Sequence, residues 1–411
     1  MPPAMTGALP PAIAPCAVPL RPAAEVVARE IARAPDGPLI LLSRSGALRA
    51  LLRLREAIPG VSVHYAVKAC GESSLLATLW QAGCGFELAT AGELPALGEA
   101  VGVRLDAARL LCGNPVRSAT QTAALYEAGV RLFAADSVEE VVRTARCAPA
   151  ARLLLRVAVP AAVERGANDP AWWPMRDTFG VAPVDLAAIV AAARKHGVDI
   201  AGACFHVGSQ CNEARAWARG IAAAGHALEM AHAAGHSARV LSLGGGFPVV
   251  LEGACGPTTG SAADSHAPAI EAIGAALSPA LAGLPADITL LAEPGRYLVA
   301  SAGVLLTRVT ALRTHRGQRW LQLDCGLHNG LIESTRGLPY RIRPLRGSGE
   351  RVAWRIAGPS CDGADVLPGE WLLPAGIAEG DWLAIDGAAA YAQSRASPFN
   401  GLPAPVTRVV D

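Results

Sequence analysis

The chain has 411 residues, of which 52% are hydrophobic, and a formal net charge of +1, so it can bury a large core and has no charge excess that would attract nucleic acid. Aromatic residues make up only 5% of the chain, no motif for stacking single-stranded bases occurs, and no apolar stretch has membrane-spanning length. The 10 cysteines show neither a Cys-x-x-Cys pair nor a cluster at zinc-ligand spacing, so neither a disulfide framework nor a metal site is indicated.

The start of the chain is apolar, but prolines interrupt it and no basic segment precedes it. These properties make a poor signal peptide. We therefore expect a cytoplasmic protein with a flexible N-terminal tail over residues 1–36.

From about Val61 to Gly295, short apolar runs alternate with amphipathic stretches at a spacing typical of repeated βα units. The expected strands are Val61–Val67, Gly85–Leu88, Arg109–Cys112, Arg131–Ala135, Arg152–Val159, Ile200–Val207, Val240–Leu243 and Ile288–Ala292. Most are separated by helices, such as Ser74–Ala82, Ser137–Arg146, Leu186–Lys195 and Ala214–Ala234. This order predicts an α/β fold, a (β/α)8 TIM-like barrel over residues 37–295.

After Gly295 the pattern changes to strand-like runs with Gly, Pro and Asp turns between them. These runs are Tyr297–Arg308, Arg319–Leu323, Val352–Ala357, Trp371–Pro374 and Trp382–Ile385. They predict a C-terminal β-rich domain over residues 296–411. The apolar run at 38–42 precedes the barrel, and residues 37–45 could add an N-terminal strand to that same domain.

Lysine is nearly absent: of the 36 Lys and Arg residues, only Lys68 and Lys195 are lysine. Lys195 lies at an expected helix C-terminus, where a cation suits the helix dipole. Lys68 instead ends the first barrel strand, where the active sites of barrel enzymes lie. Only lysine can be deprotonated and condensed with a carbonyl to form a Schiff base, so Lys68 is a candidate covalent residue. The alternative is an ordinary salt-bridging lysine at a strand end.

Other polar residues fall at the ends of the later barrel strands. Glu87 lies in the second strand, His206 ends the sixth, Gly244-Gly245-Gly246 follows the seventh, and Glu293-Pro294-Gly295-Arg296 follows the eighth. Loops after the seventh and eighth strands often bind phosphate, because free N–H groups there point at an anion. A lysine opposite a phosphate site is what pyridoxal 5'-phosphate requires, one group for its aldehyde and the other for its phosphate.

Two further residues suit the same cofactor. Glu293 could keep the pyridine nitrogen protonated, which makes the ring an electron sink, and His206 could stack on the ring face. A lone acid before Pro-Gly is also commonly a turn residue, and a lone histidine at a strand end is commonly a satisfied core group. Taken singly, these residues leave both interpretations open.

Six motifs occur in order along the chain and together carry a family resemblance. They are Tyr65-Ala66-Val67-Lys68-Ala69, His206-Val207-Gly208-Ser209, Gly244-Gly245-Gly246-Phe247-Pro248, Glu293-Pro294-Gly295-Arg296, Gly358-Pro359-Ser360-Cys361-Asp362-Gly363, and Asp386-Gly387-Ala388 with Tyr391. In this order they resemble the fold-type III pyridoxal-phosphate-dependent decarboxylases, the group of ornithine/lysine, diaminopimelate and arginine decarboxylases, whose barrel is of the alanine-racemase type.

The resemblance implies a role for each matching residue. Lys68 would be the Schiff-base lysine, with His206 on the ring face and Glu293 at the pyridine nitrogen. The remaining residues that it implies around the cofactor are Glu87, Ser209, Gly245, Gly246, Gly295, Arg296 and Tyr391. Glu87 stands where the family more usually has Asp, and Cys70 stands where it usually has Asn.

The resemblance also implies a homodimer with shared active sites. Cys361 of one subunit would enter the other subunit's site and protonate Cα after CO₂ leaves, which a thiol can do. Asp362 resembles the ornithine/lysine branch, whose members use this residue to hold a distal ammonium. We expect both Asp362 and Asp365 to bind the substrate. The segment 324–330 differs from the eukaryotic ornithine decarboxylase pattern, which supplies a second substrate carboxylate in that region.

We therefore expect decarboxylation of a basic amino acid such as ornithine or lysine, releasing CO₂ and an amine, as in polyamine biosynthesis. The alternatives are a decarboxylase of diaminopimelate or of a citrate-conjugated diamino acid in siderophore biosynthesis. An inactive regulatory homologue and an amino-acid racemase on the same barrel are further readings. The presence together of Lys68, Glu293, Arg296 and Cys361 argues against a loss of catalysis.

Overall fold

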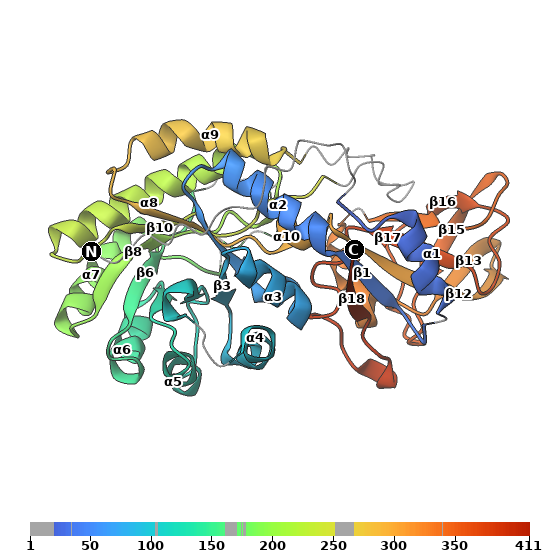
Figure 1. Ribbon diagram of the computed structural model, residues 1–411, viewed down its shortest axis with the longest axis horizontal. Helices are drawn as coiled ribbons and strands as arrows, with labels where there is room; N and C mark the ends of the chain where they lie inside the picture. Colours follow the sequence, from blue (N-terminus) through green and yellow to red (C-terminus); the bar gives the residue numbers. More distant parts are fainter. Residues whose placement is uncertain are drawn as a thin grey trace.

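The computed structural model describes residues 20–33, 35–102, 106–160, 171–173, 175, 178–250, 267–338 and 340–411. Two parts lie side by side along the longest axis of the molecule (Figure 1). A barrel surrounded by helices occupies one end, and a β-rich part occupies the other.

The barrel is closed and has eight strands, in the spatial order β10-β11-β2-β3-β4-β5-β6-β8. Neighbouring strands are parallel throughout. The strands are β2 (Ser62–Ala66), β3 (Gly85–Leu88), β4 (Leu110–Cys112), β5 (Leu132–Ala135), β6 (Arg152–Arg156), β8 (Asp199–Cys204), β10 (Val240–Ser242) and β11 (Thr289–Ala292). Each corresponds to a predicted strand, so the predicted barrel is confirmed.

Helices form the outer layer of the barrel (Figure 1). They are α2 (Arg44–Ala57), α3 (Ser73–Gln81), α4 (Leu94–Val101), α5 (Ala119–Glu127), α6 (Val138–Cys147), α7 (Leu186–Lys195), α8 (Arg215–Ala233) and α9 (Ile270–Ala282). Local sequence explains where two of these helices begin. The Ser137 side chain accepts a hydrogen bond from the Glu140 N–H and caps α6, and Ser118 caps α5 in the same way. Val141 and the other buried residues of α6 then cover the strands.

The β-rich part is a mixed sheet of eight strands, including the N-terminal strand β1 (Leu39–Ser43). The others are β12 (Gly303–His315), β13 (Gln318–Leu323), β14 (Arg341–Pro344), β15 (Arg351–Ala357), β16 (Trp371–Pro374), β17 (Trp382–Asp386) and β18 (Val406–Val410). Leu39 of β1 pairs with Leu306 of β12 and with Val406 of β18. The expected pairing of the early strand with the C-terminal domain is therefore confirmed, and β14 and β18 are strands that the sequence analysis missed. The exact domain boundaries remain predictions.

One predicted strand begins too early. The expected strand Tyr297–Arg308 is helical at its start, because Arg296–Val299 form the short helix α10 and β12 begins only at Gly303. The Ala300 N–H donates to the Arg296 carbonyl at 2.9 Å. This turn redirects the chain from the barrel to the β-rich sheet, a requirement that the apolar run itself does not reveal.

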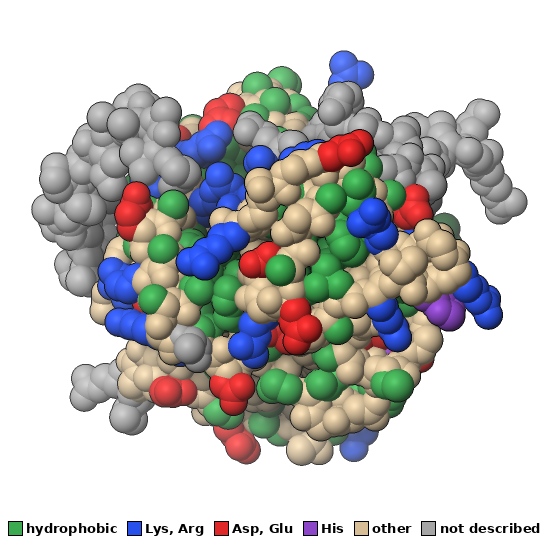
Figure 2. Space-filling view, turned by 90° about the vertical axis from the view of Figure 1, so that its right-hand side faces the viewer, with side chains coloured by type: hydrophobic (Ala, Val, Ile, Leu, Met, Phe, Trp, Pro, Cys, Tyr) green, Lys and Arg blue, Asp and Glu red, His purple; other side chains and the backbone are tan. Residues whose placement is uncertain are grey.

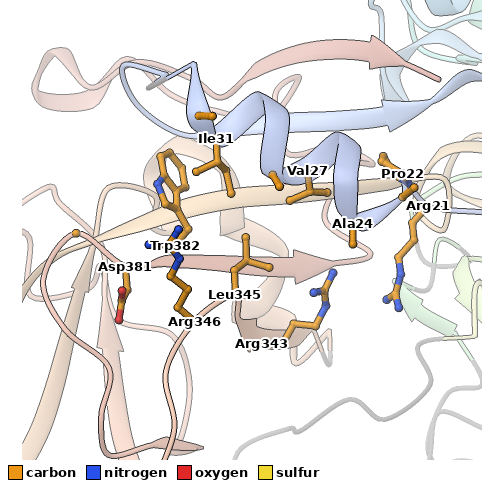
Figure 3. Close-up of a pocket in the computed structure, with 14 residues that line it drawn as sticks. Arg21, Pro22, Ala24, Val27, Ile31, Arg343, Leu345, Arg346, Asp381 and Trp382 are labelled. Carbon is orange, nitrogen blue, oxygen red and sulfur yellow. The ribbon is translucent and has the colours of Figure 1, made fainter.

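Helix α1 (Ala24–Ala32) lies in the segment for which a flexible tail was expected. Val27 is buried against the sheet in a cluster with Leu39 and Leu306, and the buried Glu30 accepts from Arg408 of β18 at 2.9 Å. Figure 3 shows α1 above β14 and β17, with Ile31 facing Trp382. Residues 24–32 are therefore ordered by packing that is remote in sequence, and residues 1–19 lie outside the described residues.

The end of the molecule formed by the β-rich part carries acidic and basic side chains interspersed with apolar ones (Figure 2). Within the part of the chain that the structure describes, no helix is long and apolar enough to cross a membrane.

Candidate active site

Lys68 lies directly after β2, in a single 3-10 turn over Val67–Ala69. Its Nζ donates to Glu87 Oε2 at 2.5 Å, since β2 and β3 are neighbours and Ala66 is paired with Glu87. Burial lowers the pKa of Lys68, but the charge of Glu87 and its hydrogen bond outweigh that effect and raise the pKa above its ordinary value. The Lys68 amine therefore carries a proton that Glu87 is placed to take.

Glu293 follows β11 and lies near Glu87. A Cβ added to Gly113 would lie 2.8 Å from Glu87 Oε1 and 2.9 Å from Glu293 Oε2, so the backbone of Gly113 touches both acids. Burial and, after it, the charge of Glu87 raise the pKa of Glu293, while a hydrogen bond from Ser242 Oγ opposes the shift. A cation placed beside Glu293 would stabilise its ionised form.

Arg156 at the end of β6 belongs to this cluster, although the sequence analysis did not identify it. Its Nη1 donates to the Gly113 carbonyl at 3.1 Å, and its guanidinium carbon lies 4.9 Å from the centre of the Phe179 ring. An arginine that ends an apolar barrel strand was the signal that could have found it.

His206 follows β8 and faces the cluster as a neutral ring. The Gly208 N–H donates to His206 Nδ1 at 2.9 Å, so Nδ1 carries no proton. Burial, followed by the positive charges of Arg156 and Lys68, lowers the pKa of His206 well below its ordinary value. The imidazole can therefore stack on an aromatic ring without bringing a charge into the site.

The glycine loop after β10 lies against His206 and the Gly208 turn. Gly244 and Gly246 have positive φ angles of 63° and 91°, and a Cβ on them would collide with the carbonyls of Phe205 and Gly208 respectively. A Cβ on Gly245 would come within 3.1 Å of His206 Nε2. Ser209 starts the short strand β9 (Ser209–Cys211) beside this loop, where the Cys211 N–H donates to the Gly246 carbonyl. The predicted residues His206, Ser209, Gly245 and Gly246 thus come together.

Arg296 is buried behind the turn that follows Glu293. Its two terminal nitrogens donate to Glu333 at 2.8 Å and 2.7 Å, and both side chains are at most 4% exposed. Glu333 was not identified from sequence. Among the described residues, Arg296 Nε is a buried donor without a hydrogen-bond acceptor.

Tyr391 joins the β-rich part to the Lys68 turn. Its N–H donates to the Ala69 carbonyl at 2.8 Å, and its ring lies 5.0 Å from the Arg296 guanidinium carbon. A Cβ on Gly295 would lie 3.1 Å from the Tyr391 hydroxyl. The two segments meet again where Ser394 Oγ donates to the Lys68 carbonyl at 2.6 Å.

Residues 46–300 match the family model described as the pyridoxal binding domain of pyridoxal-dependent decarboxylases. The chain belongs to this family. It is 31% identical to the lysine/ornithine decarboxylase of Selenomonas ruminantium over 85% of this chain and 83% of that protein. It is also 28% identical to antizyme inhibitor 2 of Xenopus laevis over 92% of this chain and 82% of that protein.

A solved structure of lysine/ornithine decarboxylase from Vibrio vulnificus, complexed with cadaverine, superposes on this decarboxylase with a TM-score of 0.81 at 25% identity. The match covers 95% of this chain and 100% of that one. The decarboxylase fold and the cofactor class that the sequence predicted are therefore confirmed.

The residues present fit pyridoxal phosphate. Within the described part of the chain, Arg296 Nε is a buried donor that still lacks an acceptor, and the backbone of the glycine loop carries no side chains. Both features suit a phosphate. Lys68 supplies an amine for the aldehyde, and the buried Glu293 suits a protonated pyridine nitrogen.

Cys361 and Asp362 lie elsewhere, in the loop between β15 and β16 of the decarboxylase. These strands form the end of the β-rich part that is remote from β2 and β3 (Figure 1). Cys361 is exposed and has a positive φ of 59°, and among the described residues neither it nor Asp362 has a hydrogen bond or ion pair with Lys68, Glu87 or Glu293. One subunit therefore does not by itself bring Cys361 to its own Lys68.

Asp365, expected beside the substrate, is instead a structural residue. It is 1% exposed, and its carboxylate accepts from the Leu327 N–H at 2.6 Å and from Ser360 Oγ at 2.6 Å. A Cβ on either Gly326 or Gly358 would collide with it. The carboxylate of Asp365 therefore fastens the Cys361 loop to the segment that begins at Leu327.

Proposed function

We propose that this decarboxylase removes the α-carboxylate of a basic amino acid of the ornithine/lysine type. The observation that carries the proposal is the cluster of Lys68, Glu87 and Glu293 opposite the glycine loop, in a chain that keeps Cys361 followed by Asp362 on an exposed loop. The relatives whose names specify lysine and ornithine support the substrate class.

Pyridoxal phosphate, when bound, supplies an electron sink for the electron pair that the Cα–carboxylate bond leaves behind. Lys68 would hold the aldehyde, Glu293 the pyridine nitrogen, and His206 a ring face. Ser209, Gly245, Gly246, Gly295, Arg296 and Tyr391 would surround the phosphate. Glu87 would take and return the proton of the Lys68 amine across the 2.5 Å contact.

Protonation of Cα is assigned to Cys361 of a second subunit. The exposed position of Cys361 and its separation from the Lys68 of its own chain support a homodimer in which each β-rich part completes the other site. Asp362 beside it would then face the distal ammonium of the substrate.

The test is CO₂ release by cofactor-loaded enzyme from ornithine, lysine, arginine, meso-diaminopimelate and a citryl-diaminopropionate conjugate. Turnover of ornithine or lysine above the others supports the proposal. Turnover of the conjugate or of diaminopimelate alone would keep the cofactor and overturn the substrate class.

The match to antizyme inhibitor 2 gives a second candidate, a regulatory homologue without catalysis. The presence of Lys68 next to Glu87 disfavours it. A purified protein that shows no visible absorption band with added pyridoxal phosphate and releases no CO₂ from any of the five compounds would favour it.

A further inference from the structure

The carboxylate of Asp362 has two neighbours from its own chain. His328 Nε2 lies 3.0 Å from Asp362 Oδ2, and the Ala364 N–H donates to Asp362 Oδ1 at 3.0 Å. The Ala364 N–H and His328 together lower the pKa of Asp362, so the carboxylate is ionised at neutral pH. Each oxygen keeps a further lone pair for an outside donor, and the side chain is 36% exposed.

His328 is itself held in place on more than one side. Its ring packs against Phe399 with the ring centres 4.7 Å apart, and its carbonyl accepts from the Ser397 N–H at 2.8 Å. Asp365 ties the neighbouring Leu327 N–H to Ser360, the residue before Cys361. The imidazole and the loop that carries Asp362 are thus parts of one braced unit.

We propose that His328 is a positioning residue that aims the Asp362 carboxylate at the distal ammonium of the substrate. An aspartate with two free side-chain torsions would lose rotamer freedom when it binds an ammonium. A carboxylate that an imidazole already fixes loses less rotamer freedom on binding, so it binds the distal ammonium more tightly. This inference rests on the proposed function, because it requires a substrate whose distal cation pairs with Asp362.

The test compares the variants His328→Leu, His328→Gln and Asp362→Asn in the cofactor-loaded, full-length protein. For His328→Leu, KM for the preferred basic amino acid should rise about 5-fold to 10-fold, while kcat changes by less than about 2-fold, because the distal contact is equally strong in the ground and transition states. His328→Gln, whose amide can still donate to Asp362, should recover most of the lost affinity. Asp362→Asn should raise KM at least as much as His328→Leu.

Two further readouts separate positioning from a general disturbance of the loop. The alkylation rate of Cys361 by iodoacetamide, followed by peptide mass spectrometry, should be unchanged in His328→Leu. The dissociation constant of 1,5-diaminopentane, followed by the visible absorption of the bound cofactor, should show the same order of variants without turnover.

An unchanged KM and diamine affinity in His328→Leu, with both weakened in Asp362→Asn, would overturn the role of His328 alone. If Asp362→Asn is also without effect, Asp362 is not the distal ligand and the role of His328 fails with it, whereas the substrate class stands or falls by CO₂ release from the five compounds. Altered Cys361 alkylation together with no recovery in His328→Gln would show a purely structural role and would also overturn the proposal.

Discussion

At the mouth of the barrel, the Lys68 amine and the Glu87 carboxylate are 2.5 Å apart, and Glu293 is close behind. Burial, and after it the charges of Arg156 and Lys68, favour a neutral His206. Burial and the charge of Glu87 favour a protonated Glu293, whereas for Lys68 burial is outweighed by the charge of Glu87, which favours the charged amine. The neutral His206 suits stacking on a ring face. To take the parts that we assign to them, Lys68 must give its proton to Glu87 and Glu293 must be ionised by a cation beside it. The chemistry of each side chain is thus set by its neighbours as much as by its type.

The first prediction concerns Lys68. Lys68→Ala should abolish the visible absorption of bound cofactor and lower CO₂ release by about 10²-fold to 10⁴-fold, the range for losing a group that acts in the chemical step. Lys195→Ala is the matched control, since Lys195 is exposed at the end of α7 and should change neither measurement. Normal turnover by Lys68→Ala would remove it from the mechanism.

The second prediction concerns Cys361. Cys361→Ala should slow turnover by about 10²-fold, or should lead to protonation at an atom other than Cα. The visible absorption of the cofactor should stay unchanged. Product analysis in D₂O reports where the deuterium is placed. Cys147→Ala, at the half-buried end of α6, serves as the control. Wild-type rates and deuterium placement in Cys361→Ala would contradict the role.

At the scale of elements, strand ends and the turns after them form the site. β2, β3, β6, β8, β10 and β11 each deliver a residue to the same end of the barrel, which follows from their parallel direction. The glycine loop after β10 is the most constrained of these turns, because its backbone lies against the carbonyls that precede Ser209. The Cys361 loop is built differently, around the buried carboxylate of Asp365.

The third prediction tests that constraint. Gly244→Ala should lower the free energy of unfolding by about 1–3 kcal/mol and weaken cofactor binding, because a left-handed conformation and a collision with the Phe205 carbonyl occur together. Gly235→Ala has a similar φ of +89° but open space around its Cβ, so it should cost only about 1 kcal/mol and leave cofactor affinity unchanged. Urea denaturation and cofactor titration measure both. Equal effects of the two substitutions would show that the collision is relieved by the loop.

At the scale of the whole molecule, the first and the last strands of the described residues are neighbours in one sheet. β1 lies between β12 and β18, so residues separated by more than 300 positions are hydrogen-bonded neighbours. Tyr391 and Ser394 then connect this sheet to the Lys68 turn. The β-rich part is thereby held against the barrel, while Cys361 is exposed in the loop between β15 and β16.

The fourth prediction follows from that arrangement. A mixture of inactive Lys68→Ala and Cys361→Ala subunits, exchanged to equilibrium, should regain up to about one quarter of wild-type activity, since half of the dimers pair one variant with the other and hold one intact site. Each variant mixed with itself is the control. No recovery, despite subunit exchange shown by native mass spectrometry, would contradict shared active sites.

The sequence by itself determined the eight barrel strands, the C-terminal β-rich part and the residues that follow each strand, because alternation of apolar runs and strand-end position are local properties. It also singled out Lys68, since lysine is rare in this chain. Arg156 was overlooked although its strand-end position was a usable signal. The sequence could not reveal Glu333 or His328, because each acts through a partner far away in sequence, Arg296 and Asp362 respectively. The tertiary structure alone decided that Asp365 is a buried brace and that Ala24–Ala32 form a helix, because burial and hydrogen bonding depend on which distant segments the fold brings into contact.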